Sequence, residues 1–591
     1  MSRLPILFCI LALAVEPAAA QSPAGTPTTT ASADALIGLW KAKRWFGPDA
    51  RGPLIVRRTG ATYTADMVGR TLPVRVDSGQ LSFDLPSGQG AFRGKLKSDG
   101  LIVGWWIPSR SIAMGGRLSP VELKPDGPNR WSGQVVPFDD TFTFYLKVEK
   151  RADQSLGALL RNPERDYGAW LGVDRIAREG NAVKLLGKRP GQEQEREITS
   201  GTFDKDRDRE TIILDFPSRG GTYEFTRDGD YSDFYPRGKN PSHYVYRAPL
   251  RRDDDWPTGT LEEAGIDRAA MEKFIQLIID MPMDSVNSPQ IHGVLIARHG
   301  KLVLEEYFHG EHRDKLHETR SAAKSLTATI VGAAMHAGTQ LKLSTPVYQM
   351  MNGGTFPPDL EPPKRAMTLE NLLTMTSGYF CDDNNDQAPG NEQNMDDQQD
   401  EPDWYRYTLK VPMAFAPGEK AIYCSANPNL ALGVLSRATG ESPLATFERL
   451  VGGPMKITRY GWPTDPVGHP YGGGGVQLLL RDFTKLGQLM LNGGTWQGHR
   501  ILSRDFVARA SSPLYKIGER GYGYLWWGMD YKYHDRMIHT FQALGTGGQI
   551  VTVVPDLDLV IASNGANYSS RGWRLFQYEL IPKYILPAIT H

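Results

Sequence analysis

The stretch TRSAAKSLTATIVGAAM, residues 319–335, places a serine and a lysine three positions apart at the start of an apolar run. The run favours a buried helix, and Ser321 and Lys324 would share one face of it because positions three apart lie on the same side. A serine hydroxyl becomes a good nucleophile when a nearby group takes its proton, and a desolvated lysine can help. The helix N-terminus would also favour a developing oxyanion. The stretch therefore predicts a nucleophilic Ser321 with Lys324 beside it.

Helical and strand patterns alternate on both sides of this stretch. The predicted elements are a helix from about residue 267, a hairpin turning at His299-Gly300, the Ser321 helix ending at Gly338, two strands around Pro555-Asp556 and a closing helix from about residue 571. The Gly338 position is typical of a helix C-terminus, and a two-residue turn with glycine is typical of a hairpin. Residues 257–591 are therefore predicted to form an α+β catalytic domain.

Residues 35–250 show a different pattern, with short alternating strands separated by Gly, Asp and Pro turns. Examples are LSFDL at 81–85 and FTFYLKV at 142–148. Because long helical periodicity is lacking, this β-rich region is predicted to form one or two antiparallel sheets or barrels. Its tryptophans are expected in the core, with a ligand-binding surface as the alternative; they are Trp40, Trp45, Trp105, Trp106 and Trp131.

The first 20 residues are typical of a secretory signal peptide. Arg3 supplies the positive charge, residues 4–15 are apolar, and Ala18-Ala19-Ala20 matches a small-residue cleavage site. The apolar run is too short to span a bilayer. Residues 21–34, rich in Ser, Thr, Pro and Ala, are expected to form a flexible leader. We therefore expect a periplasmic or secreted protein with no membrane span after the signal peptide is removed.

The overall charge argues against polyanionic partners. The chain has 67 basic and 67 acidic side chains, so its formal net charge is zero and no global field favours nucleic acid or an anionic membrane. We expect a small-molecule or short oligomeric ester or amide substrate. An envelope glycan or protein is the alternative partner for the β-rich region. No metal and no organic cofactor are expected.

The order of predicted elements resembles the serine β-lactamase and penicillin-recognising hydrolase family, most of all its class C-like branch of esterases and 6-aminohexanoate-dimer hydrolases. Beside Ser321 and Lys324, the stretches that carry the resemblance are RHGKLVLEEYF at 298–308, LLTMTSG at 372–378 and Pro417-Gly418. The resemblance covers about residues 256–591. It implies a β-lactamase/transpeptidase-like fold, an antiparallel sheet flanked by helices with a helical insertion.

The second motif of that family is a tyrosine, one residue, then Asn or Ser, and here it reads YCS at 423–425. The resemblance implies that Tyr423, stabilised by the Lys324 ammonium, relays a proton between the serine and the leaving group. An ordinary tyrosine, with a pKa of about 10, serves as a base only beside a cation. Ser425 is predicted to contact the substrate, and Asn427 is the alternative for that contact.

The third family motif, Lys-Thr-Gly, is missing from the chain. Its place is held by GTGGQ at 545–549, just before an apolar strand. Glycines let a backbone approach the substrate closely, and a strand N–H there would supply the second oxyanion donor. The predicted substrate or oxyanion residues are Gly545, Thr546, Gly547 and Gly548, with His539 as the alternative occupant of the lysine position. The missing lysine weakens the case for β-lactam substrates.

Two cysteines, Cys381 and Cys424, remain once the signal peptide is removed. A pair of cysteines in an exported protein predicts one disulfide, with two buried free thiols as the alternative.

Residues 368–404 contain no Lys or Arg. Acidic residues accumulate in its later part: Asp382, Asp383, Asp386, Glu392, Asp396, Asp397, Asp400, Glu401 and Asp403. Such a run is usually a solvated loop. The alternative is a lid over the site that repels anions or holds calcium, although the EF-hand spacing is absent.

These features predict an exported serine hydrolase that cleaves an ester or amide through an acyl-enzyme on Ser321. A β-lactamase or D-Ala-D-Ala peptidase of the same fold is one alternative. The other is a non-catalytic envelope-binding protein that uses the β-rich region.

Overall fold

The computed structural model describes residues 33–46, 50–109, 116–137, 141–188, 191–206, 209–227, 233–568 and 571–590. The predicted signal peptide and nearly all of the predicted leader lie outside these ranges. Within them, no helix is both long enough and apolar enough to cross a bilayer.

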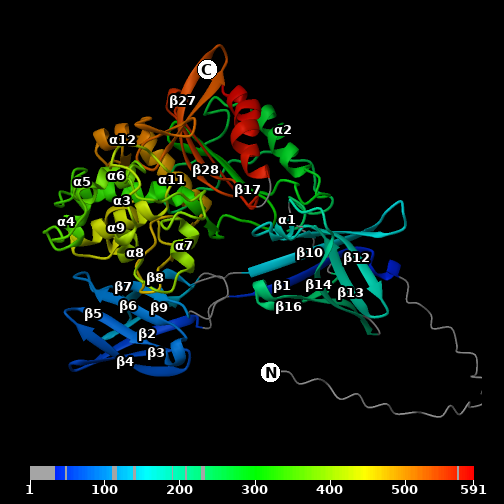
Figure 1. Cartoon of the computed structure of the whole chain (residues 1–591), viewed down its shortest axis with the longest axis horizontal. Helices are drawn as coiled ribbons and strands as arrows, with labels where there is room; N and C mark the ends of the chain where they lie inside the picture. The colour runs from blue at the N-terminus through cyan, green and yellow to red at the C-terminus, as the bar shows by residue number, and fades with distance from the viewer. Residues whose placement is uncertain are drawn as a thin grey trace, which may run out of the picture.

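The N-terminal part of the chain contains a closed antiparallel barrel of eight strands (Figure 1). Its first strand, β1 (Gly38–Trp45), pairs with both β10 and β16, and this double pairing closes the barrel. The other strands are β10 (Thr141–Lys150), β11 (Leu156–Arg161), β12 (Val173–Glu179), β13 (Ala182–Gly187), β14 (Arg196–Asp206), β15 (Arg209–Phe216) and β16 (Gly221–Thr226), with the short helix α1 (Tyr167–Leu171) between β11 and β12. Alternate residues of these strands, such as Trp40, Phe144 and Phe225, fill its core.

A second group of eight antiparallel strands is inserted between β1 and β10. The strands are β2 (Gly52–Thr59), β3 (Thr62–Met67), β4 (Arg70–Asp77), β5 (Gln80–Asp84), β6 (Ala91–Leu96), β7 (Ile102–Ile107), β8 (Arg117–Pro125) and β9 (Arg130–Val135). Because β9 pairs with both β2 and β8, this group also closes on itself. The predicted antiparallel β-rich region is confirmed. The core prediction for its tryptophans holds for Trp40 and Trp106, but Trp45 is 60% exposed.

The C-terminal part, which was predicted to be catalytic and is called the catalytic part below, is built on an eight-stranded antiparallel sheet with the order β18-β17-β29-β28-β27-β26-β25-β24. The strands are β17 (Ile291–Arg298), β18 (Lys301–Tyr307), β24 (Tyr515–Ile517), β25 (Arg520–Tyr522), β26 (Trp527–Tyr533), β27 (Arg536–Gly545), β28 (Gln549–Val554) and β29 (Leu559–Gly565). The predicted hairpin turns at His299 and Gly300, both at positive φ (53° and 74°), as a tight two-residue turn requires.

Helices cover both faces of this sheet (Figure 1). On one face, α2 (Arg268–Ile279) packs with the C-terminal helical segment η8 (Phe576–Ile585). The opposite face carries α11 (Leu480–Leu491) and, beyond it, the helical insertion. The helices of that side are α3 (Lys324–His336), α4 (Val347–Met351), α5 (Pro362–Ala366), α6 (Leu369–Leu373), α7 (Glu392–Asp397), α8 (Trp404–Lys410), α9 (Ala426–Thr439), α10 (Pro443–Phe447) and α12 (Arg504–Ser511). The predicted α+β class, with a sheet flanked by helices and a helical insertion, is confirmed.

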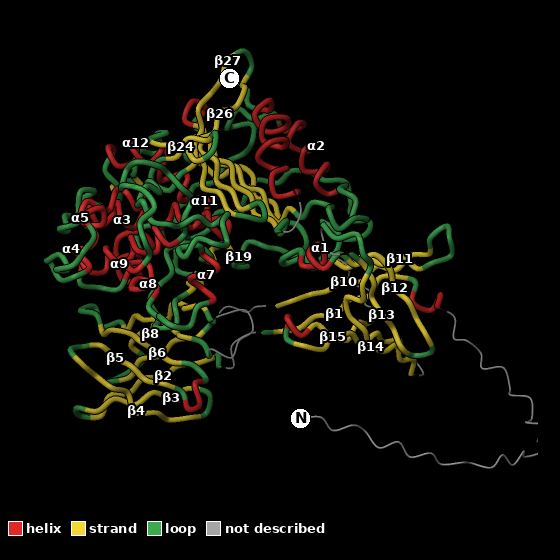
Figure 2. The backbone as a smooth tube through the Cα atoms, viewed as in Figure 1, coloured by secondary structure: helices red, strands yellow, loops and turns green. Residues whose placement is uncertain are grey.

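The second strand group is joined to the catalytic part by backbone pairing. Its strand β8 pairs with β20 (Tyr460–Pro463), which continues through β21 (Gln477–Leu478) to β19 (His317–Glu318). Figure 2 shows β8 lying directly below the helices of the insertion. Because β19 ends three residues before Ser321, the strand group is tied to the segment that carries the predicted nucleophile.

Candidate active site

Ser321 lies in a short 3₁₀ turn, η4 (Arg320–Ala323), which runs directly into α3. The preceding Arg320 has a φ of +49°, a conformation that is costly for a residue other than glycine. This sharp entry places Ser321 at the end of the helix and at the surface of a pocket. Almost every residue of α3 is buried, which explains its apolar sequence, and Gly338 follows its end at positive φ, as predicted.

Lys324 donates hydrogen bonds from its Nζ to Ser321 Oγ at 2.9 Å and to the Gly473 carbonyl oxygen at 2.5 Å. Burial lowers the pKa of this amine, but attraction by Tyr423, Glu392 and Asp383 outweighs burial, so the net pKa is raised. The side chain is therefore an ammonium ion at neutral pH. An ammonium can stabilise an alkoxide on Ser321, but it cannot take the serine proton.

Tyr423 lies beside the lysine, with its ring centroid 4.8 Å from Lys324 Nζ. Its ring stacks on Trp527 of β26 at 5.5 Å, so two separate elements fix its position. The structure thus brings together the three residues predicted to be catalytic: Ser321, Lys324 and Tyr423.

Ser425 occupies a different position from the one predicted. Its side chain is fully buried, and both its backbone N–H and its hydroxyl donate to one carboxylate oxygen of Asp383, at 2.9 and 2.6 Å. The predicted substrate contact by Ser425 is therefore wrong, because its hydroxyl is already used to hold Asp383. Asn427, the alternative, is also buried, and its amide nitrogen lies 3.8 Å from the sulfur of Met375.

The GTGGQ segment passes beside the turn that carries Ser321, which we call the nucleophile turn. Thr546 lines the same pocket as Ser321. Gly545 ends β27 against the nucleophile turn, where a Cβ atom would overlap the Thr319 carbonyl oxygen, so only glycine allows this approach. Gly547 and Gly548 both have φ near +100°.

The alternative prediction, that His539 occupies the position of the missing lysine, is wrong. It lies six residues before Gly545 on β27, roughly 20 Å along an extended strand. There it is exposed and bonded to Asp530 at 2.7 Å.

A four-glycine segment, Gly472–Gly475, forms a further wall that our sequence reasoning missed. Gly473 accepts the hydrogen bond from Lys324, and Gly472 accepts one from the Thr327 hydroxyl at 2.8 Å. Gly474, at φ +154°, lies against the backbone of Arg320 and Ser321. The signal was the run of four glycines itself, because glycine is the residue that allows two backbones to approach this closely.

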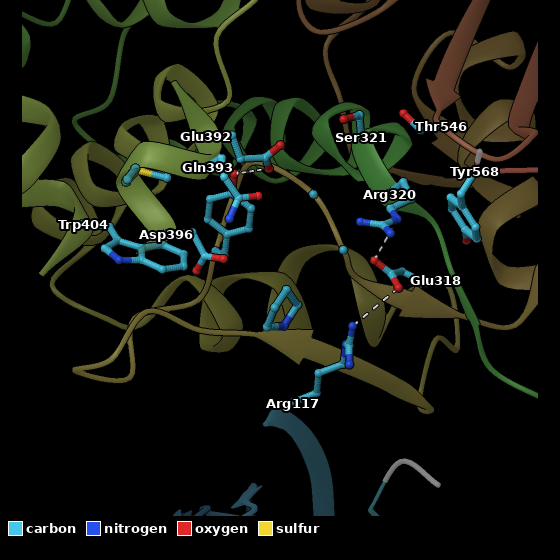
Figure 3. Close-up of a pocket in the computed structure, with 15 residues that line it drawn as sticks. Arg117, Glu318, Arg320, Ser321, Glu392, Gln393, Asp396, Trp404, Thr546 and Tyr568 are labelled. Carbon is cyan, nitrogen blue, oxygen red and sulfur yellow. Dashed lines mark hydrogen bonds and ion pairs between the residues drawn. The ribbon is translucent and has the colours of Figure 1, made fainter. Parts of the chain in front are cut away.

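The pocket in front of Ser321 has a volume of about 430 Å³. One wall comes from the acidic segment, since Glu392, Asp396 and Trp404 line it (Figure 3). Glu392 accepts a hydrogen bond from the Tyr471 hydroxyl at 2.6 Å. The prediction of a solvated segment holds for Asp386, Asp396, Asp397 and Asp400, which are exposed, but it is wrong for the half-buried, hydrogen-bonded Glu392.

The opposite wall is basic, because Arg117 of β8 and Arg320 both line it and flank Glu318 (Figure 3). The Glu318 carboxylate lies 3.5 Å from Arg117, 3.2 Å from Arg320 and 3.0 Å from a third guanidinium, that of Arg165. Burial raises the pKa of Glu318, but the three guanidinium groups outweigh burial and lower the pKa to about 2. Glu318 is therefore ionised at any ordinary pH.

Cys381 and Cys424 are joined in a disulfide, as predicted. The bridge connects the acidic segment to the residue that follows Tyr423. The backbone N–H of Asp383 also donates to the Tyr423 carbonyl oxygen at 3.0 Å. The acidic wall and the predicted proton relay are thus held together covalently.

One trio among the described residues has carboxylate and imidazole atoms close enough for a metal: Asp403, Asp465 and His469. Protein donors already occupy these carboxylates. Asp465 accepts hydrogen bonds from the backbone of Trp404 and from both the backbone and the ring of His469. Asp403 caps α8. We therefore assign this trio a structural role.

Residues 279–566 match the model of the Beta-lactamase family. A curated relative, the 6-aminohexanoate-dimer hydrolase of Paenarthrobacter ureafaciens, is 26% identical over 227 residues, which are 36% of this chain and 55% of the relative. The chain therefore matches about half the length of that relative.

Two solved structures are similar at lower identity. The hydrolase EstCE1 is 15% identical, with a TM-score of 0.41 over 55% of this chain and 98% of that chain. A β-lactamase-like protein of Bacteroides dorei is 18% identical, with a TM-score of 0.43 over 55% of this chain and 99% of that chain. The match to the family model covers the sheet, the turn that carries Ser321 and the helical insertion, so this part of the chain is similar to the Beta-lactamase family.

Proposed function

We propose that this protein is a serine hydrolase that cleaves an ester or an amide through an acyl-enzyme on Ser321. The observation that carries the proposal is the hydrogen bond of 2.9 Å between Lys324 Nζ and Ser321 Oγ at the surface of a 430 Å³ pocket. A buried ammonium bonded to a hydroxyl beside such a pocket is suited to activating that hydroxyl.

The positions of the three side chains support separate roles in proton transfer. Tyr423 takes the proton of the Ser321 hydroxyl, because Lys324 is already protonated and acts as a donor. Ser321 Oγ then forms a bond to the substrate carbonyl carbon. The leaving group departs with the proton from Tyr423, and water later attacks the acyl-enzyme by the reverse transfer.

In this proposal, two backbone N–H groups stabilise the oxyanion of the tetrahedral intermediate. The N–H of Ser321 lies at the end of a helix, where the backbone dipole favours negative charge. We propose the N–H of Thr546 as the second donor, because Thr546 lines the same pocket as Ser321 and follows Gly545, which packs against the nucleophile turn. Gly545 makes this approach sterically acceptable.

A fluorophosphonate probe tests the proposal directly. We expect covalent labelling of Ser321, located by peptide mapping, and loss of both labelling and ester hydrolysis in Ser321→Ala. The neighbouring Ser325→Ala is the matched control, since the Ser325 hydroxyl donates to the Leu525 carbonyl oxygen instead of facing the pocket. Unchanged ester hydrolysis in Ser321→Ala would contradict the proposal.

The β-lactamase or D-Ala-D-Ala peptidase alternative shares this chemistry and differs in substrate. Nitrocefin turnover and penicillin labelling of Ser321 separate it from an esterase or amidase. We propose the esterase or amidase because the lysine of the third family motif is missing at the GTGGQ segment.

We also propose that the protein is exported to the periplasm or secreted. The signal-like first 20 residues and the disulfide between Cys381 and Cys424 support this location, since disulfides persist in oxidising compartments. Cell fractionation with N-terminal sequencing tests it, and an intact N-terminus in the cytoplasm would contradict it.

A further inference from the structure

Glu318 is the point at which three separate parts of the chain meet beside the nucleophile turn. Its carboxylate lies 3.5 Å from Arg117 of β8, 3.0 Å from Arg165, which follows β11, and 3.2 Å from Arg320 of the turn itself. Figure 3 shows Glu318 between Arg117 and Arg320. The match to the Beta-lactamase family begins at residue 279, so Arg117 and Arg165 lie outside it. One carboxylate therefore connects both strand groups to the nucleophile turn.

The first barrel presents Arg165 from a loop that is docked onto the catalytic part. Arg161, at the end of β11, is 2% exposed and donates to the carbonyl oxygens of Ser285 and Ser288 at 2.7 and 2.9 Å. Within the loop, the backbone N–H of Arg165 donates to the side-chain oxygen of Asn162 at 2.8 Å. The loop is therefore fixed on both sides, and the Arg165 guanidinium is held at the carboxylate.

The inserted strand group presents Arg117 through main-chain pairing. In the pairing of β8 with β20, Arg117 lies opposite Pro463, and Leu118 lies opposite Trp462. Leu118 and Trp462 are both buried in the core of the catalytic part. Because Arg117 is the neighbour of this buried contact, the packing of the strand group decides where its guanidinium lies.

The contact between Glu318 and Arg320 carries these restraints to the nucleophile. Arg320 has a φ of +49°, a conformation that persists only when its surroundings enforce it. Its guanidinium contacts the Glu318 carboxylate and lies 4.7 Å from the ring centroid of Tyr568. Its carbonyl oxygen accepts from the Gly475 N–H at 3.2 Å. Ser321 is the next residue, so a shift of Arg320 would displace the Ser321 hydroxyl.

Resting on the function proposed above, we propose that Glu318 is a positioning residue for the nucleophile and that both strand groups serve hydrolysis by holding it in place. The Glu318 side chain is only 10% exposed, so solvent screens its ion pairs poorly. Removing its charge leaves the guanidinium groups around it without this partner, which disturbs a buried ion-pair network strongly. The β-rich region then has a function at the active site.

The variant Glu318→Gln tests the proposal with two esters of different size, p-nitrophenyl acetate and p-nitrophenyl hexanoate. We expect kcat to fall about ten- to a hundredfold for both, since displacing a reacting atom by about 1 Å costs on the order of a hundredfold in rate. KM should change little. Active-site titration corrects each rate for the folded, active fraction. Wild-type kcat, or a loss confined to one ester, would overturn the positioning role.

Double-mutant cycles test whether each strand group acts through Glu318. Arg165→Gln and Arg117→Gln should each lower kcat, and each should add little to the loss in Glu318→Gln, because a cycle isolates the coupling within one pair. The controls should keep wild-type kcat. They are Arg175→Gln on the first barrel, where Arg175 pairs with Glu195, and Arg75→Gln on the inserted group, where Arg75 is 80% exposed. Additive losses would overturn the part of the strand group concerned.

Hydrogen exchange separates this proposal from the failure of the hydrolase assignment. If Ser321 is not labelled and no ester is cleaved, the proposed function fails, yet mass spectrometry of the peptide covering residues 318–323 still reports on the turn. We expect its amides to exchange about tenfold faster in Glu318→Gln and in Arg165→Gln than in the wild type or in Arg175→Gln. If Glu318→Gln yields no folded protein, Arg165→Gln carries the same test. Unchanged exchange in the folded variants would overturn the proposal.

Discussion

Lys324 and Asp383 attract each other electrostatically although they are 59 positions apart in the sequence. The carboxylate of Asp383 helps to raise the pKa of the lysine, and the lysine lowers the pKa of the carboxylate against the larger effect of burial. Asp383 is in turn held by Ser425 and by the backbone of Tyr423. The ammonium beside the nucleophile is thus stabilised by the acidic segment.

Replacing Lys324 by methionine should lower kcat about a hundred- to ten-thousandfold, because the Ser321 hydroxyl loses its only charged donor among the described residues. Stopped-flow hydrolysis of a p-nitrophenyl ester measures this effect. The exposed Lys342→Met serves as the control, and its kcat should stay within a factor of two or so of the wild type. Near-normal turnover in Lys324→Met would contradict the assigned role.

Asp383 should make the folded protein less stable as the pH rises from about 4 to 6. Burial raises the folded-state pKa of this carboxyl from 3.8 to about 6, so the native protein holds the proton more tightly than the unfolded chain does. The contribution of the Asp383 carboxyl group to the free energy of unfolding is therefore complete below pH 4 and is lost as the pH rises towards 6. Melting temperatures across this range should fall less steeply in Asp383→Asn, while the exposed Asp400→Asn should follow the wild-type slope.

Removing the disulfide with Cys381→Ala and Cys424→Ala together should lower the free energy of unfolding by about 2–4 kcal/mol. The bridge closes a loop with a sequence separation of 43, and such a cross-link reduces the entropy of the unfolded chain. Urea titration measures the loss. Because Tyr423 precedes Cys424, kcat for ester hydrolysis should also fall in the double variant. Unchanged stability after complete reduction of the wild type would contradict this account.

Gly545→Ala should impair catalysis and stability together. The new Cβ would overlap the Thr319 carbonyl oxygen and crowd Arg320, which displaces the nucleophile turn and costs about 1–3 kcal/mol. Gly528→Ala on β26 is a matched control, since its Cβ would have no neighbour closer than 3.5 Å. Active-site titration and thermal melting compare the active fraction and the melting temperature of the two variants. Equal values for both variants would argue against the close packing of Gly545.

Tyr460→Phe should weaken the contact between the inserted strand group and the catalytic part. The Tyr460 hydroxyl accepts from Trp105 Nε1 at 3.0 Å and donates to Glu448 at 2.8 Å. Burial raises the pKa of Glu448 to about 7, even though the donation from Tyr460 lowers it. Losing the hydroxyl leaves both partners without this bond, at a cost of about 1–3 kcal/mol. Urea titration should show this decrease in the free energy of unfolding. The control Tyr578→Phe should show little change, because Tyr578 is 43% exposed.

Local sequence patterns predicted much of the catalytic part. Apolar residues at helical spacing indicated α2 and α3, and a glycine turn between apolar runs indicated the β17–β18 hairpin. Ser321, Lys324 and Tyr423 were predicted because each has a recognisable motif. The four-glycine wall at residues 472–475 was missed, although its composition carried a signal.

Errors arose where the role of a polar residue depends on a distant partner. Ser425 was assigned to the substrate, but Asp383, 42 positions earlier, takes both of its hydrogen bonds. The acidic segment was expected to be solvated because runs of charged residues usually are. The sequence does not show that part of this segment lines a pocket. His539 was an alternative only because its position on the strand relative to the nucleophile could not be known.

The sequence by itself predicted Ser321 as the nucleophile, the lysine on its helical face and the β-rich character of residues 35–250, because these follow from spacings of a few residues. Only the tertiary structure decided that Arg117 and Ser321 line one pocket. That relationship depends on the pairing of β8 with β20, in which Leu118 lies opposite Trp462. Strand pairing between segments more than 300 residues apart depends on packing of the whole fold, and no local pattern specifies it.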